Sequence, residues 1–182
     1  MEKQIRKIVI IGPESTGKST LCTQLAAHFK TKWVPEYART YLETNGTNYT
    51  FENLYEIAVG QLASEDAAVT ALQQQNLVQP TPLFIDTDMY VMKVWSEFVF
   101  NKCDNRILNH INQRSYDLYL LCNVDLPWVK DNLREYPDLA TRDKLFHYYK
   151  DAMVTQQTPW VIIKGNYEQR FQQAIAAVHT IL

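Results

Sequence analysis

Short runs of apolar and β-branched residues alternate along the chain with longer segments in which apolar residues recur at helical spacing. The short runs predict strands over Lys7–Ile11, Lys32–Val34, Leu83–Ile85, Leu118–Cys122 and Trp160–Ile163. The longer segments predict helices over Lys18–Lys30, Phe51–Gln75, Met89–Phe100, Leu126–Arg134, Arg142–Gln156 and Glu168–Ile181. This alternation is typical of an α/β fold with a parallel sheet.

Length and charge narrow the classes of protein to consider. The chain has 182 residues, of which 46% are hydrophobic, and this suits a single domain over residues 1–182 with a substantial core. Its net charge of −2 is not basic enough for a general nucleic-acid-binding protein, so we expect no nucleic-acid partner. No apolar run approaches the length that spans a bilayer, so we expect no membrane partner. No feature of the sequence indicates an oligomeric state.

The cysteines indicate a reducing compartment. Cys22, Cys103 and Cys122 lack the spacing of metal ligands or of a C-x-x-C motif, which favours buried reduced thiols. No signal pattern precedes the first predicted strand. We therefore expect a cytoplasmic protein without disulfides.

A phosphate-binding motif joins the first predicted strand to the first predicted helix. The stretch GPESTGKS, residues 12–19, fits G-x-x-x-x-G-K-[ST] in the strand–loop–helix context that this motif requires. Gly12 and Gly17 permit backbone angles closed to other residues, so that successive N–H groups can converge on phosphate oxygens. A chance glycine-rich turn is the alternative, and the flanking strand and helix argue against it.

The chemistry of this loop predicts how it would hold a nucleotide. Lys18 supplies positive charge to the β- and γ-phosphates, and the Ser19 hydroxyl is placed to ligate Mg²⁺. We therefore expect ATP and Mg²⁺ as cofactors. The expected ATP-binding residues here are Gly12, Glu14, Ser15, Thr16, Gly17, Lys18, Ser19 and Thr20.

Polar residues follow the second predicted strand, in the stretch VPEYARTY. Ligands of open parallel sheets bind beyond the carboxyl ends of the strands. Glu36, Tyr37 and Arg39 are therefore candidates for substrate binding. The alternative is the solvated start of a helix, where a glutamate is favourable in any case.

Two aspartates follow the third predicted strand, in the stretch LFIDTDMY. Asp86, at the end of the apolar run, is the expected partner of the phosphate loop and a candidate catalytic and metal residue. It can hold Mg²⁺ through the water shell of the ion or accept a proton from an incoming hydroxyl. Asp88 can bind substrate or metal, or it can cap the helix that starts there.

A polar segment over residues 125–146 is interrupted by Pro127 and Pro137. Such a segment suits a mobile lid that closes over a nucleotide. Arg134 and Arg142 would then act as catalytic residues by bringing positive charge to the transferring phosphoryl group. The alternative is a surface helix with exposed arginines, which are common.

Three further residues have weaker signals. After the fifth predicted strand, Gly165 can let the backbone approach an adenine ring closely. Trp95 and Trp128 can stack on the aromatic base of a substrate. They can equally belong to the core, which is the usual environment of tryptophan.

A GTP-driven switch is the alternative from another functional class. Residues 101–104, NKCD, fit the N-K-x-D pattern and resemble the guanine-reading motif of GTPases, but they follow a helical pattern rather than a strand. The stretch Asp86–Met89 also lacks the glycine that a GTPase switch carries three residues after its aspartate. We therefore interpret this match as a chance one and expect ATP as the donor. A purely structural or interaction module is a weaker hypothesis still.

Five stretches, GPESTGKSTL, VPEYARTYLE, FIDTDMY, DLPWVKDNLRE and KGNYEQR, together resemble the ribosylnicotinamide kinase domain of the bacterial NadR-type NAD-synthesis proteins. The resemblance extends from Gly12 to Arg170. It implies a P-loop nucleoside kinase fold of three α/β/α layers, with a five-stranded parallel sheet in the order 2-3-1-4-5 and a helical lid. It also implies transfer of the ATP γ-phosphate to the 5′-hydroxyl of nicotinamide riboside in NAD salvage, which makes this nucleoside the expected partner.

The charge balance of the expected acceptor site is acidic. Glu36, Asp86 and Asp88 outnumber Arg39, and such a site suits a neutral or cationic nucleoside better than a nucleoside monophosphate. A kinase for another nucleoside, or for a nucleoside monophosphate, is the alternative function.

The sequence departs from the larger members of that family. Those members join the kinase to an adenylyltransferase domain usually marked by H-x-G-H, and some add a DNA-binding domain. We expect neither adenylyl transfer nor repressor function here, because no such motif is formed by the four histidines, His28, His110, His147 and His179.

Overall fold

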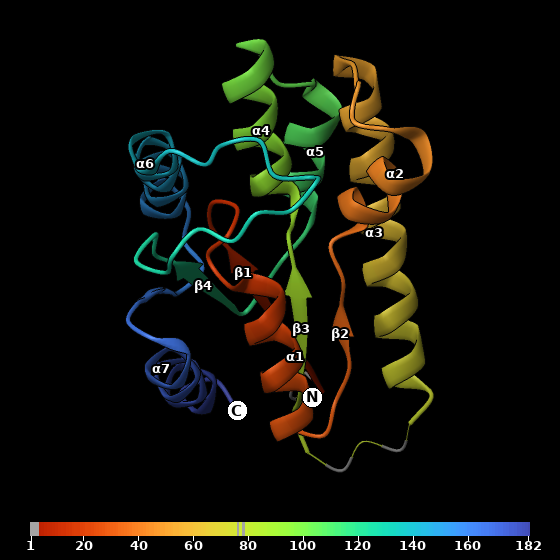
Figure 1. Cartoon of the computed structure of the whole chain (residues 1–182). Coiled ribbons are helices and arrows are strands. Elements are labelled where there is room, and N and C mark those ends of the chain that lie inside the picture. Colours follow the sequence, from red (N-terminus) through yellow and green to blue (C-terminus); the bar gives the residue numbers. More distant parts are fainter. Residues whose placement is uncertain (1–3, 76, 78) are drawn as a thin grey trace.

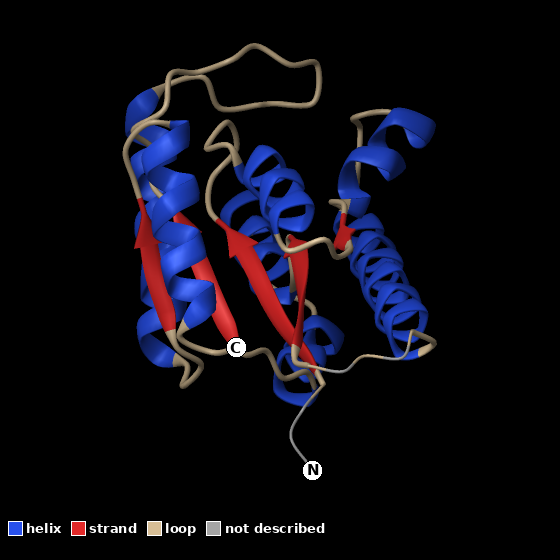
Figure 2. Ribbon diagram, turned by 90° about the horizontal axis from the view of Figure 1, so that it is seen from below, coloured by secondary structure: helices blue, strands red, loops and turns tan. Residues whose placement is uncertain are grey.

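Five parallel strands form the centre of the molecule in the order β2-β3-β1-β4-β5, with helices on both faces of the sheet (Figures 1 and 2). The structure is a computed structural model that describes residues 4–75, 77 and 79–182. The strands are β1 (Ile5–Ile11), β2 (Trp33–Val34), β3 (Thr81–Asp86), β4 (Leu118–Cys122) and β5 (Trp160–Ile163). The predicted α/β class and strand order are confirmed.

Seven helices connect these strands in the described part of the chain. They are α1 (Lys18–His28), α2 (Tyr37–Asn45), α3 (Phe51–Gln73), α4 (Met89–Phe100), α5 (Asn105–Gln113), α6 (Leu139–Thr155) and α7 (Tyr167–His179). Helices α1 and α7 cover one face of the sheet, and α3, α4 and α6 cover the other (Figure 1). Helices α2 and α5 pack on α3 and α4, beyond the edge of the sheet.

The central strand β1 explains why the sheet needs helices on both faces. Ile8, Val9, Ile10 and Ile11 have no exposed surface. Ile8 and Ile10 pack in the cluster that includes α1 and α7, whereas Val9 and Ile11 pack in the cluster that includes α4 and α6. A continuous apolar run of this kind is typical of a parallel strand covered on both sides.

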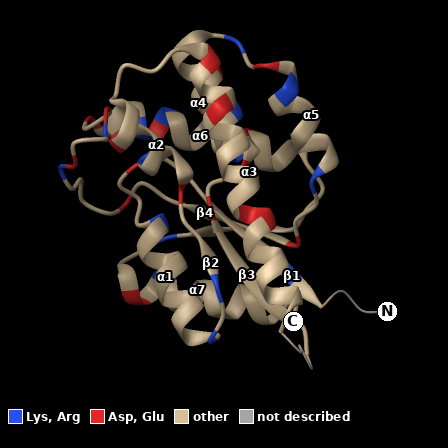
Figure 3. Cartoon of the chain, turned by 90° about the vertical axis from the view of Figure 1, so that its right-hand side faces the viewer, with Lys and Arg blue, Asp and Glu red and all other residues tan. Residues whose placement is uncertain are grey.

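Charged residues of both signs are interspersed over the helices and loops in the view of Figure 3. Within the residues that the structure describes, no helix has the length and apolar character needed to cross a membrane.

Two helices were not predicted from the pattern. Helix α2 begins at Tyr37, directly after the segment that follows β2. Helix α5 begins after Asp104, whose side chain accepts a hydrogen bond from the backbone N–H of Arg106 (2.8 Å). Both helices have only nine residues and bury few of them, Ala38 and Leu42 in α2 and Ile107 in α5, so each offers a short apolar pattern along the sequence.

The N-K-x-D stretch follows α4, as expected from the sequence, and it precedes α5. Asn101 adopts a left-handed conformation (φ 54°) that ends α4, and Asp104 caps α5. Both outer residues of the pattern therefore have a local role at a helix end.

The prediction of a helix over Leu126–Arg134 is wrong. Residues 123–138 form an irregular segment, which we call the lid loop, between β4 and α6. It extends from β4 toward α2 and returns to α6 (turquoise in Figure 1). Pro127 disfavours a helical conformation at the residue before it. Several backbone N–H groups of the lid loop also bind side chains of the phosphate loop, which replaces the hydrogen bonds that a helix would provide.

Arg170 on α7 links three backbone segments at the carboxyl edge of the sheet. It is 2% exposed, and its guanidinium donates to the carbonyl oxygens of Gly165 (2.7 Å), Thr16 (3.1 Å) and Asn123 (2.9 Å). It also forms an ion pair with Asp125 at the start of the lid loop. One buried side chain thus ties the phosphate loop to the ends of β4 and β5.

We expect the substitution Arg170→Met to lower the free energy of unfolding by about 2–4 kcal/mol, because three carbonyl oxygens lose a charged donor. Urea unfolding followed by circular dichroism measures this change. Arg106→Met is the matched control, since Arg106 is exposed and contacts only the Asp104 carboxylate and the ring of Tyr55; its midpoint should lie much closer to that of the wild type. Equal midpoints for both variants would contradict the role of Arg170.

Candidate active site

The phosphate loop, residues 12–19, leaves β1 in a conformation that depends on two glycines. Gly12 has a φ of 139°, and a Cβ at this position would lie 2.7 Å from the carbonyl oxygen of Cys122 at the end of β4. Gly17 has a φ of 79° and precedes the first residue of α1. The close approach at Gly12 and the left-handed turn at Gly17 bring the loop to the N-terminus of α1, where unpaired N–H groups favour an anion.

Asp86 lies beside the start of α1, at the carboxyl end of β3. The Ser19 hydroxyl donates to Oδ2 of Asp86 at 2.5 Å. The other carboxylate oxygen, Oδ1, is buried and has no hydrogen-bond partner within the described part of the chain. Burial, reinforced by the nearby Glu36 carboxylate, raises the pKa of Asp86 to about 7, while Lys18 and Ser19 act in the opposite direction.

Ser19 and Asp86 together fit a magnesium ion that arrives with a nucleotide. Mg²⁺ in phosphoryl-transfer sites takes one or two protein oxygens and completes its octahedron with phosphates and water. A hydroxyl and a carboxylate with one unpaired oxygen match this requirement. Among the described residues there is no group of three or more histidine, cysteine, aspartate or glutamate side chains that could hold a metal.

A cavity of about 200 Å³ adjoins the phosphate loop, and its other walls come from α2, α4, α6 and the lid loop. The lining residues that the sequence analysis singled out are Gly12, Glu14, Ser15, Thr16, Gly17, Lys18, Ser19, Thr20, Glu36, Arg39, Trp95 and Arg134. The lining residues that it missed are Pro13, Ala38, Leu42, Val91, Phe98, Leu133, Glu135, Tyr136, Leu145 and Tyr149.

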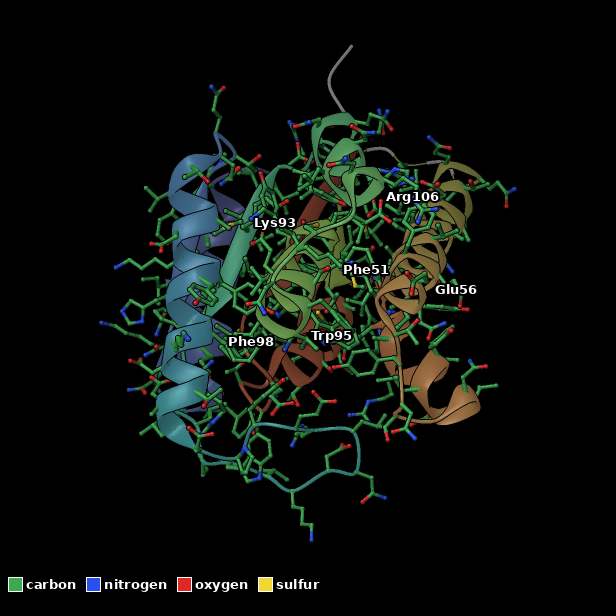
Figure 4. The ribbon with its side chains drawn as sticks, turned by 90° about the horizontal axis from the view of Figure 1, so that it is seen from above. Phe51, Glu56, Lys93, Trp95, Phe98 and Arg106 are labelled. Carbon is green, nitrogen blue, oxygen red and sulfur yellow. The ribbon has the colours of Figure 1, made fainter. Side chains whose placement is uncertain are left out.

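Most of the missed residues are apolar and form, together with Trp95, the apolar wall of the cavity. Val91, Trp95 and Phe98 are spaced by four and three residues on α4, so they share one face of that helix. Figure 4 shows Trp95 and Phe98 on the side of α4 nearer the lid loop, with Lys93 on the other side. The ring of Tyr136 in the lid loop packs edge-on against Phe98, with centroids 5.2 Å apart. The helical spacing around Trp95 was the signal that could have identified Val91 and Phe98.

Charged residues of α2 and of the segment before it lie at the opposite side of this wall. Glu36 accepts a long hydrogen bond from Thr87 Oγ1 (3.4 Å). The Arg39 guanidinium pairs with Asp131 of the lid loop at 2.9 Å and with Glu43 at 3.7 Å. The positive charge of Arg39 is therefore already balanced, and the net charge of this side is negative.

The lid loop is bound to the phosphate loop through backbone N–H groups. The Glu14 carboxylate accepts from the N–H of Glu135 (3.0 Å) and from the N–H of Tyr136. Ser15 Oγ accepts from the N–H of Val129 (3.0 Å). Burial raises the pKa of Glu14, and these two N–H groups oppose that rise. The structure thus presents the lid loop closed over the phosphate loop.

The two predicted lid arginines have different environments. Arg134 lines the cavity, and its Nη1 lies 3.4 Å from Ser15 Oγ. Arg142 belongs to α6 and is 4% exposed; its Nε and Nη1 are buried with no hydrogen-bond partner in residues 4–75, 77 and 79–182. Trp128 lies near both arginines, with its ring centroid 5.9 Å from Cζ of Arg134 and 5.3 Å from Cζ of Arg142. Arg142 and Trp128 lie outside the cavity lining, and the structure places Trp128 against charged groups of the lid.

Asp88 has the capping role that the sequence left as its alternative. It is 1% exposed, and its Oδ1 accepts from the N–H groups of Tyr90 (3.0 Å) and Val91 (3.3 Å) at the start of α4. Its Oδ2 accepts from the hydroxyl of Tyr119 (2.7 Å). Both oxygens are occupied within the fold, and Asp88 lies outside the cavity lining.

Tyr37 and Gly165 also lie outside the cavity lining. Tyr37 packs against Gly60 of α3 so closely that a Cβ there would lie 2.0 Å from its ring. At Gly165 a Cβ would lie 2.3 Å from Oε1 of Gln169, which belongs to the capping box of α7. The ring of Tyr37 thus occupies the space beside Gly60, and the side chain of Gln169 occupies the space beside Gly165.

Comparison with known protein families and structures identifies the fold and places it among relatives. A family described as an AAA domain matches residues 7–170, from β1 through the phosphate loop to Arg170. The chain belongs to this AAA domain family.

Curated relatives carry this AAA domain in longer chains. The trifunctional NAD biosynthesis/regulator protein NadR of Salmonella typhimurium is 27% identical over 183 residues, covering 98% of this chain and 43% of the relative. The NadR of Escherichia coli is 26% identical with the same coverage. The chain therefore spans less than half the length of the curated relatives that it matches.

Solved structures confirm the architecture of the AAA domain. A NadR structure in complex with NR has a TM-score of 0.78 at 22% identity, over 98% of this chain and 50% of the NadR chain. A second NadR structure, in complex with NAD and AMP-PNP, has a TM-score of 0.76 at 22% identity, over 98% of this chain and 49% of the NadR chain. A thymidylate kinase from Ehrlichia chaffeensis has a TM-score of 0.67 at 11% identity over 97% of this chain and 100% of that one. The fold is that of the P-loop kinases.

The raised pKa of Asp86 predicts a pH-dependent stability of the free AAA domain. In an unfolded chain this carboxyl has a pKa of about 4. Between about pH 4 and pH 7 the folded state therefore keeps a proton on Asp86 that the unfolded state has lost. The free energy of unfolding falls as the pH rises through this window. The asparagine of Asp86→Asn cannot lose this proton, so the variant escapes the loss of stability. In EDTA, we expect the free energy of unfolding of Asp86→Asn, relative to that of wild type, to be higher at pH 8 than at pH 5 by about 1–3 kcal/mol.

Thermal unfolding at the two pH values measures this difference. Asp138→Asn is the control, because Asp138 is an exposed helix cap with a lowered pKa and has lost its proton throughout this range. A stability difference for Asp86→Asn that is the same at pH 5 and pH 8 would show that the buried carboxyl is not protonated in the free protein.

Proposed function

We propose that the protein is an ATP-dependent kinase that transfers the γ-phosphoryl group to the ribose 5′-hydroxyl of nicotinamide riboside, giving nicotinamide mononucleotide. The observation that carries this proposal is that one cavity adjoins both the phosphate loop and an aromatic wall, with the carboxylate of Glu36 opposite that wall. One side of that cavity suits a triphosphate and the other suits a flat nucleoside base. The NadR structures in complex with NR and with AMP-PNP support the same pair of ligands.

The donor site is built from residues around the phosphate loop. Lys18 lines the cavity and supplies charge to the β- and γ-phosphates. Ser19 and Asp86 would hold Mg²⁺, which neutralises phosphate charge when bound. Asp86 is fully buried and lies outside the cavity lining, so its unpaired Oδ1 would have to be reached, on ligand binding, by the water shell of the metal or by the proton of the 5′-hydroxyl.

The lid arginines complete the donor site. Arg134 already lies at the cavity, close to Ser15 of the phosphate loop. The two unpaired nitrogens of Arg142 are buried, which is unfavourable unless an anion binds to them. A phosphate oxygen of the bound nucleotide is the anion that this part of the lid would accept. Catalysis would then come from positioning and charge stabilisation rather than covalent chemistry.

The electrostatics of the acceptor side favour a cationic nucleoside. Arg39 is paired with Asp131 and Glu43, so it offers no free positive charge to an acceptor phosphate. Glu36 remains available for ribose hydroxyls. The rings of Trp95 and Phe98 can attract the positively charged pyridinium ring of nicotinamide riboside through cation–π interaction.

A nucleoside monophosphate kinase is the second candidate function. The fold similarity to thymidylate kinase favours it, since that enzyme class takes a monophosphate acceptor. For this function Arg39 would have to leave Asp131 and Glu43 and bind the acceptor phosphate. Because these two ion pairs of Arg39 would have to break, a nucleoside monophosphate kinase is the less favoured candidate.

A substrate panel distinguishes the two candidates. With ATP and Mg²⁺, we expect the purified protein to form nicotinamide mononucleotide from nicotinamide riboside, with no more than ~1% of that turnover on thymidylate, adenylate or nicotinamide mononucleotide, because a site without a free cation loses the charged contact to a phosphate. Product formation is followed by chromatography. Faster turnover of any monophosphate than of nicotinamide riboside would support the second candidate instead.

We expect Asp86→Asn to lower kcat by about 100-fold or more, because the amide keeps the shape of the side chain but removes the charge required for metal or proton. Asp66→Asn is the matched control, since Asp66 lies on α3 outside the cavity lining and pairs with Arg114 at the end of α5; its kcat should stay within about twofold of wild type. Retained activity in Asp86→Asn with a lowered melting temperature would make Asp86 a structural residue.

A further inference from the structure

We propose that Tyr49 is a positioning residue that couples closure of the lid loop to the aromatic wall of the acceptor site. Trp95 Nε1 donates to the Tyr49 hydroxyl at 2.9 Å, and this hydroxyl donates to Oε2 of Glu135 in the lid loop at 3.2 Å. Tyr49 belongs to the connection between α2 and α3, so the relay joins three separate segments. The identity of the acceptor in this proposal rests on the proposed function.

The chemistry of the three groups fixes the direction of the relay. An indole N–H can only donate, and an ionised carboxylate can only accept. The Tyr49 hydroxyl therefore accepts from Trp95 and gives its own proton to Glu135. Burial raises the pKa of Tyr49 far above neutrality, so this hydroxyl stays a donor at any working pH. The ring of Tyr49 also packs edge-on against Trp95, with centroids 4.9 Å apart.

The lid end of the relay is attached to the donor site. The N–H groups of Glu135 and Tyr136 both bind the carboxylate of Glu14 in the phosphate loop. The side chains of the same two residues reach the acceptor wall, Glu135 through Tyr49 and Tyr136 through contact with Phe98. Two adjacent lid residues therefore touch the phosphate loop with their backbone and the acceptor wall with their side chains. Trp95 and Phe98 lie on the side of α4 from which both contacts come (Figure 4).

This arrangement has a thermodynamic consequence. A nucleotide that stabilises the closed lid loop also fixes Glu135, which holds Tyr49 and thereby the orientation of the Trp95 ring. The acceptor then meets a wall that is already ordered, and its binding becomes tighter. Because coupling between two sites is reciprocal, the acceptor must increase the affinity for the nucleotide by the same factor.

The first experiment measures the coupling by titration calorimetry with nicotinamide riboside, in the presence and absence of AMP-PNP and Mg²⁺. In wild type we expect AMP-PNP to tighten acceptor binding about fivefold or more. In Tyr49→Phe the ring still packs but the relay is broken, so the factor should fall below about twofold, while the affinity for acceptor alone changes less than about twofold. Wild-type coupling in Tyr49→Phe, or no coupling in wild type, would overturn the proposal.

Two further variants separate the relay from general packing. Tyr41→Phe also removes a tyrosine–glutamate hydrogen bond, the 2.5 Å bond to Glu56, but on the exposed surface of α2 and α3, so it should keep the wild-type coupling factor. Glu135→Gln keeps an acceptor oxygen for Tyr49 and should retain coupling, whereas Glu135→Ala should lose it. Equal coupling in Glu135→Gln and Glu135→Ala would overturn the role of this side chain.

The second experiment needs no acceptor and therefore separates this proposal from the proposed function. Amide hydrogen exchange is measured with and without AMP-PNP and Mg²⁺. In wild type we expect slower exchange both in residues 129–136 and in residues 46–50; in Tyr49→Phe only residues 129–136 should respond. An identical response in both proteins would overturn the relay. Failure of the wild type to bind nicotinamide riboside, with this exchange pattern intact, would overturn only the choice of acceptor.

Discussion

The site depends on one buried guanidinium that holds its components together. Arg170 binds carbonyl oxygens of the phosphate loop, of the segment after β4 and of the segment after β5, and it pairs with Asp125 where the lid loop begins. Carbonyl groups at strand ends have no partners within the sheet, and a rigid five-donor group can satisfy several of them at once. The position of the nucleotide site and the point from which the lid loop extends are therefore set by the same side chain.

The charges of the cavity are divided between its two sides. On the side of the phosphate loop, Lys18, Arg134 and the N-terminus of α1 favour anions. On the side of α2, the carboxylate of Glu36 lies beside Arg39, whose own charge is balanced by Asp131 and Glu43. An anionic ligand on one side and a neutral or cationic ligand on the other can thus lie end to end in the same cavity, with no protein between them. This separation, more than any single residue, gives the cavity its proposed chemistry.

Sequence patterns predicted the features that depend on local chemistry. The strand runs, the glycines of the phosphate loop and the partnership of Ser19 with Asp86 follow from periodicity and motif spacing, and the structure contains all of them. A lid was predicted over residues 125–146, but the irregular conformation of the lid loop could not be, because its backbone N–H groups bind Glu14 and Ser15, more than a hundred residues earlier in the chain. For Asp88 the pattern allowed two roles, and the tertiary contact with Tyr119 was needed to distinguish them.

The position of β1 in the middle of the sheet affects the order in which the chain can fold during synthesis. Strand β1 and its glycine-rich loop leave the ribosome before β3 and β4, yet β1 pairs with both of those strands, and Gly12 lies against Cys122. The carbonyl oxygen of Thr16 accepts a hydrogen bond from Arg170, which lies 154 residues later in the chain. Contacts of such large sequence separation form late, because a long loop must close first. A nascent chain therefore contains the nucleotide motif well before α7 is made, but it gains a nucleotide site only when α7 supplies Arg170.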